Sequence, residues 1–255
     1  MNVSIDETLF ANISIDYGPP GLLGRAILKA EAAVRARGVM LTFASMHDLM
    51  LVNEINRDSW GPVFPGFDPT YNDLTPDNSF CLLGRSSRGD VVATQAGRLY
   101  DWTSTSYDEQ ARSFGLIYRD PRTQRLPNER CEVTALAAKG IDGRVFYSGG
   151  AWYHPDYRGI GLVEILPRMA RALAYARWNT RCTITMMAEH NVRKGVFPRN
   201  GYHNLEWEVR FIDTRSGTMR FALLWTKRDE MLEDLEGFLN GFEIEVGGGK
   251  RAARA

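Results

Sequence analysis

The sequence predicts a single α/β domain, in which helices flank a central mixed and mostly antiparallel sheet. Three observations lead to this fold class. Apolar residues recur at helical spacing in some segments and form short strand-like runs in others. Two turn sequences, Arg88-Gly89-Asp90 and Ser216-Gly217, each separate two such runs and predict hairpins. No internal repeat and no linker is visible, so we expect one core to hold the sheet.

The overall composition is that of an ordinary globular protein and narrows the kinds of partner to expect. Of the 255 residues, 44% are apolar and 24% are charged, and 31 basic residues balance 31 acidic ones. This balance favours neither a nucleic-acid nor a membrane partner. The N-terminus lacks the pattern of a signal sequence and no apolar run is long enough to span a membrane, so a cytoplasmic location is expected.

The cysteines and histidines predict neither disulfides nor a metal site. The three cysteines have no CxxC spacing, so we expect buried, reduced thiols at Cys81, Cys131 and Cys182. The four histidines likewise lack the spacing of metal ligands.

The first half of the chain contains the predicted N-terminal helix and three strands. Residues 22–37 place apolar side chains on one helical face, and Gly38 ends that helix. We expect residues 1–37 to be an N-terminal extension, 38–240 the main domain and 241–255 a flexible tail rich in Gly and basic residues. Further predicted elements are a strand at 39–44, a helix at 46–60, a loop at 61–78 and a strand pair at 80–84 and 91–96.

Residues 101–130 are polar, with a short helix near 108–114. We interpret this segment as an insertion over a binding face.

The second half begins with a strand at 145–153, in which Gly149-Gly150 indicates a bulge or the close approach of another group. A helix with apolar residues at helical period follows from Leu162 to Ala176. The remaining elements are a strand at 182–187, a short helix at 191–200 ended by Gly201, strands at 207–212 and 219–225, and a closing helix at 230–240.

The turn between residues 153 and 163 has the features of a phosphate site. A strand leads to Pro155, and Arg158-Gly159-Ile160-Gly161 then turns into a helix. The two glycines allow unusual backbone angles, and free N–H groups with the helix dipole favour an anion at the helix start. Arg158 adds a charged donor. An ordinary strand-to-helix turn can contain the same two glycines. The surrounding residues must therefore distinguish a phosphate site from an ordinary turn.

Those surroundings resemble a known family. The segment His154-Pro155-Asp156-Tyr157-Arg158-Gly159-Ile160-Gly161 is similar to the signature of the GNAT superfamily of acyl-CoA N-acyltransferases. In the family, Arg or Gln is followed by two residues, Gly, one residue, and Gly or Ala. Arg158 and Gly161 match the first two places. Val163 departs from the small third residue, and Pro167 removes a hydrogen bond early in the helix.

A second segment resembles the same family. Residues 191–202 are similar to the GNAT helix that ends in Gly-Phe, with Gly201 and with Tyr202 in the place of Phe. The spacing is right from His190 and one residue short from Asn191. The order of elements between residues 39 and 226 also agrees, and the N-terminal helix is extra.

The resemblance implies acetyl-CoA or coenzyme A as cosubstrate, without a metal. The backbone of the bulged strand at 149–153 would hold the thioester oxygen. The residues implied to bind the cofactor are Trp152, Tyr153, Arg158, Gly159, Ile160, Gly161, Leu162, Val163, Asn191 and Phe197.

The catalytic residues are harder to assign. The family often has a Tyr in the short helix that protonates the leaving thiolate, and its place falls on Phe197, which cannot donate a proton. Tyr202 and Tyr153 are the nearest replacements in the sequence, with an aromatic core position as the alternative for Tyr202. Glu189 is the candidate base, with a solvated charge as the alternative. His190 is either a base or a substitute for the family Asn.

Three functions remain open at this stage. The first is transfer of an acetyl group, by direct attack, to an amine of an unknown small molecule or protein, with a homodimer left open. The second is a non-catalytic acyl-CoA-binding or regulatory module, which Val163 and Phe197 favour. The third is a transferase or synthase for longer acyl chains, which would need an apolar tunnel behind the bulged strand.

Overall fold

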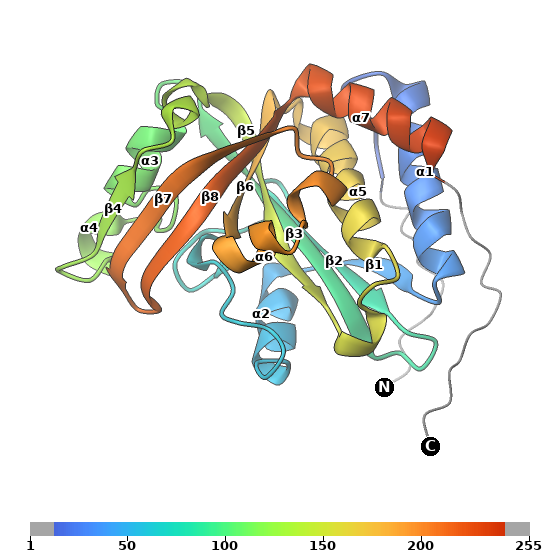
Figure 1. Ribbon diagram of the computed structural model, residues 1–255, viewed down its shortest axis with the longest axis horizontal. Coiled ribbons are helices and arrows are strands. Elements are labelled where there is room, and N and C mark those ends of the chain that lie inside the picture. The colour runs from blue at the N-terminus through green and yellow to red at the C-terminus, as the bar shows by residue number, and fades with distance from the viewer. Residues whose placement is uncertain (1–12, 243–255) are drawn as a thin grey trace.

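The computed structural model describes residues 13–242, which form one eight-stranded sheet with helices on both faces (Figure 1). The strand order is β1-β2-β3-β5-β6-β8-β7-β4, and only the β5–β6 pair is parallel. The predicted fold class is therefore confirmed. Residues 1–12 of the expected extension and 243–255 of the expected tail lie outside the described part. The strands are β1 (Met40–Ala44), β2 (Ser79–Arg85), β3 (Val91–Trp102), β4 (Arg130–Val133), β5 (Gly143–Tyr153), β6 (Cys182–Ala188), β7 (Asn204–Thr214) and β8 (Gly217–Lys227).

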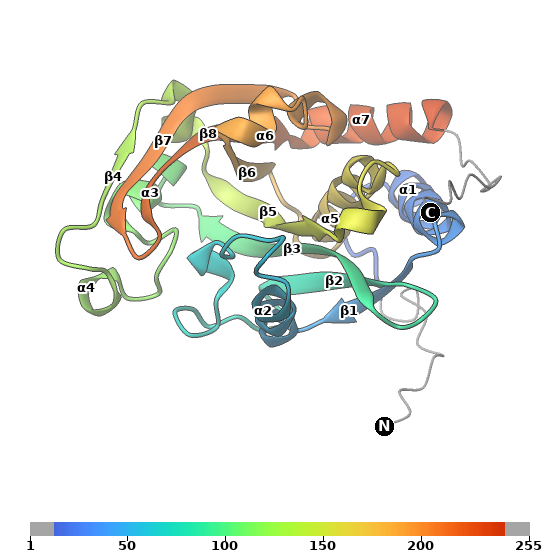
Figure 2. The same cartoon turned by 60° about the horizontal axis from the view of Figure 1, so that its bottom comes forward.

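Strand alternation divides the core into two halves. Phe80 and Leu82 of β2 enter the core beneath three long helices, whereas Cys81 and Leu83 enter the core on the other face. Figure 2 shows α1 and α5 on one side of the sheet and α2 on the other. The long helices of the first face are α1 (Pro20–Ala36), α5 (Leu162–Trp178) and α7 (Arg228–Gly241), and the second face is covered by α2 (Met46–Ile55) and α3 (Tyr107–Ser113).

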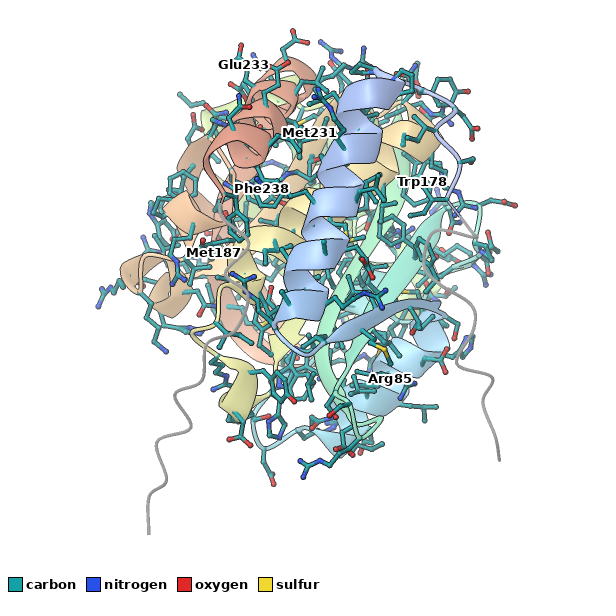
Figure 3. The ribbon with its side chains drawn as sticks, turned by 90° about the vertical axis from the view of Figure 1, so that its right-hand side faces the viewer. Arg85, Trp178, Met187, Met231, Glu233 and Phe238 are labelled. Atoms are coloured by element: carbon teal, nitrogen blue, oxygen red, sulfur yellow. The ribbon has the colours of Figure 1, made fainter. Side chains whose placement is uncertain are left out.

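The predicted N-terminal helix is present and shares the core of α5 and α7. Leu23 and Ile27 of α1 are fully buried in the same cluster as Trp178, Met231 and Phe238. Figure 3 shows α1 across the front, with these three side chains beside it. Gly38 follows the helix in the left-handed conformation, as expected for its C-terminal glycine. The division of the chain into an extension and a domain remains a prediction.

The second helix is shorter than predicted. It ends at Ile55 rather than Trp60. The Asn56 amide donates to the carbonyl of Val52 (2.8 Å), and its backbone N–H bonds to the same carbonyl. Asn side chains compete in this way with helix continuation. Trp60 therefore lies in the following loop, which includes a 3₁₀ turn at Pro65–Phe67.

The segment 101–130 has more structure than predicted. Besides the expected short helix, α3, it contributes α4 (Pro121–Gln124) and leads into β4 at the sheet edge. It packs against the loop at 61–78, where Asn72 donates to the carbonyl of Ile117 (2.9 Å). Contrary to the expected insertion over a binding face, none of its residues lines the cleft described below. It instead holds in place a loop that does.

The cysteine prediction is confirmed, because Cys81, Cys131 and Cys182 are free and buried. Within residues 13–242, no three His, Cys, Asp or Glu side chains gather closely enough to hold a metal ion. In the same part of the chain, each helix is too short or too polar to cross a bilayer.

Candidate functional site

The sheet splits between its two parallel strands. β5 and β6 pair only from Val145 to Tyr147, opposite Cys182 to Ile184. Further along, β5 stays paired to β3 up to Tyr153 and β6 stays paired to β8 up to Ala188. The two inner strands therefore separate, and a cleft with a volume of ≈ 660 Å³ opens between them. Its walls come from β5, β6, the turn before α5, the segment 190–202 and the loop 59–64.

A bulge in β5 forms part of this cleft, as predicted from Gly149-Gly150. Thr94 lies opposite Trp152 and Ala96 opposite Gly149, so β5 carries the extra residue. Both bulge carbonyls are bound by β3 side chains. The Gln95 amide donates to the Gly149 carbonyl (3.1 Å), and the Thr94 hydroxyl donates to the Gly150 carbonyl (2.6 Å). These bonds fix the direction of the bulge.

The predicted glycine turn lies at one end of the cleft. Gly159 and Gly161 have φ of 78° and 84°, and Gly161 is the N-cap of the 17-residue helix α5. No side chain caps this helix, so its first N–H groups are available to an anion. Arg37 of α1 supports the turn by donating to the carbonyl of Ile160 (2.5 Å). Every residue from Tyr157 to Val163 lines the cleft except Ile160, whose side chain packs on the core beneath α1.

Arg158 connects the turn to the loop 59–64. Its guanidinium donates to the carbonyls of Tyr153 (3.0 Å) and Ser59 (3.1 Å). The indole N–H of Trp152 donates to the hydroxyl of the same Ser59 (3.1 Å). A guanidinium has five N–H donors, so Arg158 keeps donors for a phosphate while it holds the loop.

The two departures from the family pattern both face this cleft. Val163 and Pro167 of α5 are among its lining residues. Because Pro167 has no N–H, the carbonyl of Val163 lacks its helical partner. The helix wall beside the turn is therefore bulkier and has one more free acceptor than a regular helix would.

The segment after β6 contributes the other wall. His190, Asn191, Lys194 and Asn200 line the cleft, and they belong to or follow α6 (Glu189–Arg193). Asn191 therefore lines the cleft, and its contact with the cofactor stays a prediction. Phe197 packs in a small apolar cluster with residues such as Met187 and Leu224 and does not line the cleft.

Glu189 lies outside the cleft. It forms ion pairs with Arg193 (2.5 Å) and with Arg220 of β8 (3.6 Å). These pairs agree with the solvated-charge alternative for this residue.

Tyr202 reaches the cleft from its floor. Its side chain is buried and lines the cleft, and its hydroxyl donates to the carbonyl of Ile184 (3.3 Å). Burial raises the pKa of Tyr202 to about 12, although the nearby Arg171 guanidinium and the Ser148 hydroxyl favour its ionised form. The phenol is therefore protonated at neutral pH, so it has an O–H to donate and cannot act as a base.

Several cleft residues were not predicted. Gln95, Ser148 and the aromatic residues of the loop 59–64 line it as well. A signal for the first was present, because Thr94 and Gln95 interrupt an otherwise apolar run in β3. A polar pair inside a buried strand requires partners, and here the partners are the bulge carbonyls.

The charged residues that line the cleft are all basic. Its charged lining residues are Arg158, Lys194 and Arg199, with His190 beside them, and no carboxylate lines it in the described structure. Three buried polar atoms on its lining residues have no hydrogen-bond partner, namely Gln95 Oε1, Asn200 Oδ1 and Tyr153 Oη. Such groups are rare in native proteins and commonly mark places where a ligand or water binds.

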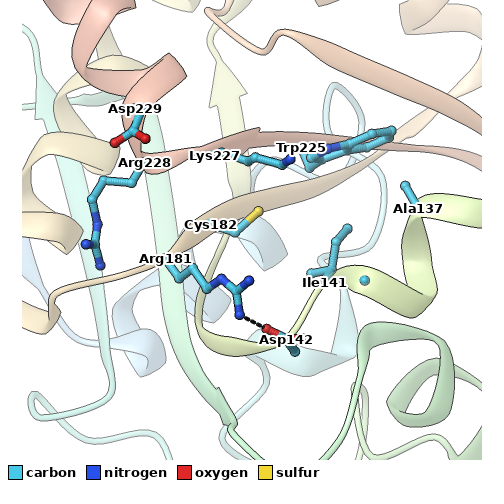
Figure 4. Close-up of a pocket in the computed structure, with 10 residues that line it drawn as sticks. Ala137, Ile141, Asp142, Arg181, Cys182, Trp225, Lys227, Arg228 and Asp229 are labelled. Atoms are coloured by element: carbon cyan, nitrogen blue, oxygen red, sulfur yellow. Dashed lines mark hydrogen bonds and ion pairs between the residues drawn. The ribbon is translucent and has the colours of Figure 1, made fainter.

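A second hollow, of ≈ 470 Å³, lies at the opposite ends of β6 and β8 (Figure 4). Both of its arginines are already engaged with the protein. Arg181 pairs with Asp142, and the Arg228 guanidinium donates to the carbonyl of Thr180 (3.3 Å). None of the predicted site residues lines it. The cleft between β5 and β6 is therefore the candidate site.

Comparison with known proteins gives structural neighbours only. No family model matches the chain, and no curated protein matches its sequence. Among solved structures, NAA60 from Arabidopsis thaliana in complex with acetyl-CoA has a TM-score of 0.48 and 10% identity, over 75% of this chain and 99% of that one. The aminoglycoside acetyltransferase AAC(6')-Ib, with coenzyme A and kanamycin, has a TM-score of 0.45 and 14% identity, over 76% and 98%.

A third neighbour is an acetyltransferase of the GNAT family from Streptococcus pneumoniae, with a TM-score of 0.43 and 14% identity, over 74% of this chain and 98% of that one. The order of elements along the chain, the bulged strand and the glycine turn follow the arrangement predicted from the sequence. In fold, the chain is similar to acetyltransferases, one of which is described as a member of the GNAT family.

Proposed function

We propose that this chain is an acyl-CoA-dependent N-acyltransferase of the GNAT type, which transfers an acetyl group from acetyl-CoA to an amine. One observation carries the proposal. The sheet opens at its only described parallel pair, and the uncapped N-terminus of α5, preceded by two left-handed glycines, forms one end of that opening. A strand split gives room for a long, narrow ligand, and the helix start gives a site for its diphosphate.

The residues present fit the diphosphate and the pantetheine arm of coenzyme A. The diphosphate would lie against the first turn of α5, with Arg158 as its charged partner. Lys194 lines the same cleft and adds positive charge, whereas Arg199 is paired with Glu164 (2.8 Å). Between β5 and β6, each strand has lost its neighbour on the cleft side, so backbone groups there are free to bind the amides of the pantetheine arm.

The acyl transfer itself needs few side chains. A neutral amine attacks the thioester carbon, the C–N bond forms as the C–S bond breaks, and the amine proton passes to the leaving sulfur. We propose that the backbone of the bulge at 149–153 binds the thioester oxygen. The bulge is held in place for this because β3 side chains bind its two carbonyls. We assign Tyr202 as the hydrogen-bond donor to the leaving thiolate, since it lines the cleft in its protonated form.

The space beside the bulge favours a short acyl group. A Cβ atom placed on Gly149 would lie 2.7 Å from the Phe67 ring, and one placed on Gly150 would lie 3.2 Å from Leu49. Both side chains are fully buried in the core beneath α2. They occupy the region in which a longer acyl chain would need a tunnel, so acetyl-CoA fits this cleft better than a long-chain thioester.

Calorimetric titration with coenzyme A tests the cofactor half of the proposal. Gly159→Asp puts a carboxylate at the open turn, where a Cβ meets no atom within 4 Å. We expect its affinity to fall at least about tenfold, because like charges repel across a few ångströms. Gly89→Asp is the matched control, since Gly89 also has a positive φ (87°) and open space but lies in the β2–β3 turn.

Equal affinities for coenzyme A in the two folded variants would overturn the diphosphate site.

Thiol release from acetyl-CoA with a panel of amines tests the proposed transfer reaction. Tight binding of coenzyme A without turnover of any amine would instead support a non-catalytic module, which the bulky Val163 at the cleft wall favours.

A further inference from the structure

The glycine turn before α5 lies against the end of α1, the helix that is extra to the family pattern. The helices α1 and α5 are neighbours on one face of the sheet (Figure 2), and the side chain of Ile160 in the turn packs on their shared core. Arg37, which directly follows α1, makes a polar contact with the turn. The end of α1 therefore reaches the candidate diphosphate site, and the inference below rests on the proposed function.

The guanidinium of Arg37 is held by two helices while it binds the turn. Its Nη1 donates to the carbonyl of Ala33 in α1 (2.8 Å), and its Nε donates to the carbonyl of Ile160 (2.5 Å). It also lies 5.4 Å from the ring centroid of Phe242, at the end of α7. Because a guanidinium is planar and its donors form a rigid fork, the bond to Ala33 fixes the direction of the bond to Ile160.

The bound carbonyl sets the direction of a neighbouring N–H group. The C=O and the N–H of a trans peptide point in opposite directions. Because the Ile160 carbonyl points toward Arg37, the N–H of Gly161 in the same peptide points away from it. Gly161 lines the cleft and Arg37 does not, so the N–H points to the cleft side of the turn. No backbone carbonyl within residues 13–242 accepts a hydrogen bond from it, which leaves it for an anion.

This peptide needs such a support because glycines flank it closely on both sides. Gly159 and Gly161 both have a positive φ, and glycine adopts either sign of φ with little cost. A peptide that turned over between them would present the Ile160 carbonyl to the diphosphate and repel it. The guanidinium also packs closely on the turn, since a Cβ atom on Gly161 would lie 3.5 Å from Nη2 of Arg37. A turn that is fixed before binding lowers the entropy cost of binding.

We propose that Arg37 is a positioning residue of the coenzyme A site and that α1 belongs to this site through it. Arg37 binds the Ile160 carbonyl and so directs the Gly161 N–H toward the diphosphate before the cofactor arrives. Arg37 acts from behind the turn, on the side away from the cleft, and does not touch the cofactor itself. The N-terminal helix therefore has a part in cofactor binding besides its part in the core.

NMR relaxation of the ligand-free full chain tests the positioning directly. Arg37→Met keeps an apolar stem but removes every donor. The heteronuclear NOE and the relaxation dispersion of the Gly161 amide report its motion on the ps–ns and μs–ms timescales. We expect this amide to be rigid in the natural chain and clearly more mobile in Arg37→Met. An equally rigid amide in this variant would overturn the proposal.

Arg25→Met is the matched control. Arg25 belongs to the same helix and is exposed, and its guanidinium donates to the carbonyl of Gly21 (3.0 Å) within α1. The variant therefore removes an arginine from α1 without touching the turn. The Gly161 amide should stay as rigid as in the natural chain.

Calorimetric titration with coenzyme A gives the consequence for binding. We expect Arg37→Met to weaken coenzyme A about tenfold, as the loss of one hydrogen bond from a charged donor would produce, and Arg25→Met to leave the affinity within about twofold. Unchanged affinity in Arg37→Met would overturn the proposal. The ratio of the dissociation constants of Arg37→Met and the natural chain should be the same at about 0.1 M and about 0.5 M NaCl, although salt screens charges. A ratio that falls to one at the higher salt would show that Arg37 acts only through its charge, and would overturn the positioning role.

Failure of this inference differs from failure of the proposed function. If the natural chain does not bind coenzyme A, the proposed function is wrong, and the inference that rests on it is wrong as well. If the natural chain binds coenzyme A but Arg37→Met loses neither the order of the Gly161 amide nor affinity, the proposed function stands and only the role of Arg37 is wrong.

Discussion

Tyr202 packs in a buried cluster and also lines the cleft. Its ring is buried beside Met187 and Leu224, and the Arg171 guanidinium lies 4.9 Å from the ring centroid. Its hydroxyl makes one long bond to the carbonyl of Ile184 (3.3 Å). The ring therefore accounts for packing, while the hydroxyl lies at the cleft floor, where the proposed transfer needs a donor.

Tyr202→Phe separates these roles. If the phenol protonates or hydrogen-bonds the leaving thiolate, kcat should fall about tenfold to a hundredfold, because one general-acid contact is lost. The affinity for coenzyme A should stay within about twofold, and the free energy of unfolding should change by no more than about 1 kcal/mol. Steady-state thiol release and urea titration measure these quantities.

Tyr100→Phe is the control for this variant. Tyr100 is also buried, and its hydroxyl also donates to a backbone carbonyl, that of Leu116, away from the cleft. Its loss should leave kcat unchanged. A normal kcat for Tyr202→Phe would show that the residue is an aromatic core position only.

Sequence reasoning located the part of the site that is local in the chain. Gly159 and Gly161 could be found because a phosphate turn depends on backbone angles that a few adjacent residues set. Trp60 and Gln95 could not be found in this way. Gln95 reaches the cleft only because the β3–β5 register shifts between Thr94 and Ala96, and that register is a property of the whole sheet.

At the scale of elements, a buried ion pair joins α5 and α7 behind the cleft. Arg168 binds Asp234 through two hydrogen bonds (2.8 and 2.9 Å), and Arg171 lies 3.5 Å from the same carboxylate. Arg171 is fully buried, and it also donates to the carbonyl of Asn200 (2.8 Å). This link fixes the segment that leads into Tyr202.

Asp234→Ala should therefore be strongly destabilising. We expect the free energy of unfolding to fall by about 3–5 kcal/mol, because two guanidinium groups lose their buried counter-charge. Asp73→Ala, which breaks the exposed pair with Arg119, should cost far less, because water screens an exposed ion pair. Urea titration of both variants measures the difference. A similar, small loss in each would mean that water or neighbouring groups compensate for Asp234.

The lengths of the elements show where sequence periodicity fails. The helices α1, α5 and α7 were predicted closely because each has one apolar face over many turns. β3 continues to Trp102, beyond the predicted end. The predicted strand was too short because its last residues, such as Gly97 and Arg98, do not alternate in polarity. β4 has four residues, Arg130–Val133, and forms only because β7 offers it an edge.

At the scale of the whole molecule, the position of the cleft follows from how the chain connects β5 to β6. The chain passes from β5 to β6 through α5, which places these strands parallel and side by side. The other described pairs are antiparallel. The sheet therefore consists of two antiparallel halves that meet along three residues of each inner strand, and the cleft opens where this short contact ends.

Five groups buried in these halves make the fold sensitive to alkali. Burial raises the pKa of Tyr100, Tyr118, Tyr202, Cys131 and Cys182 to about 12 each, from ordinary values of 10.0 for Tyr and 9.0 for Cys. Above these ordinary values, the unfolded chain releases protons that the folded chain keeps. The folded state then binds more protons, so its stability must fall as the pH rises.

We expect full stability below the ordinary thiol value of 9.0, and a loss that steepens from there toward the folded value of about 12. Each group contributes up to about 1.4 kcal/mol per pH unit in this window. Urea titrations at a series of pH values measure the slope. Tyr118→Phe should reduce it, because one buried phenol is removed from the set. A free energy of unfolding that stays constant through this window would mean that the buried phenols and thiols reach solvent without unfolding of the two cores.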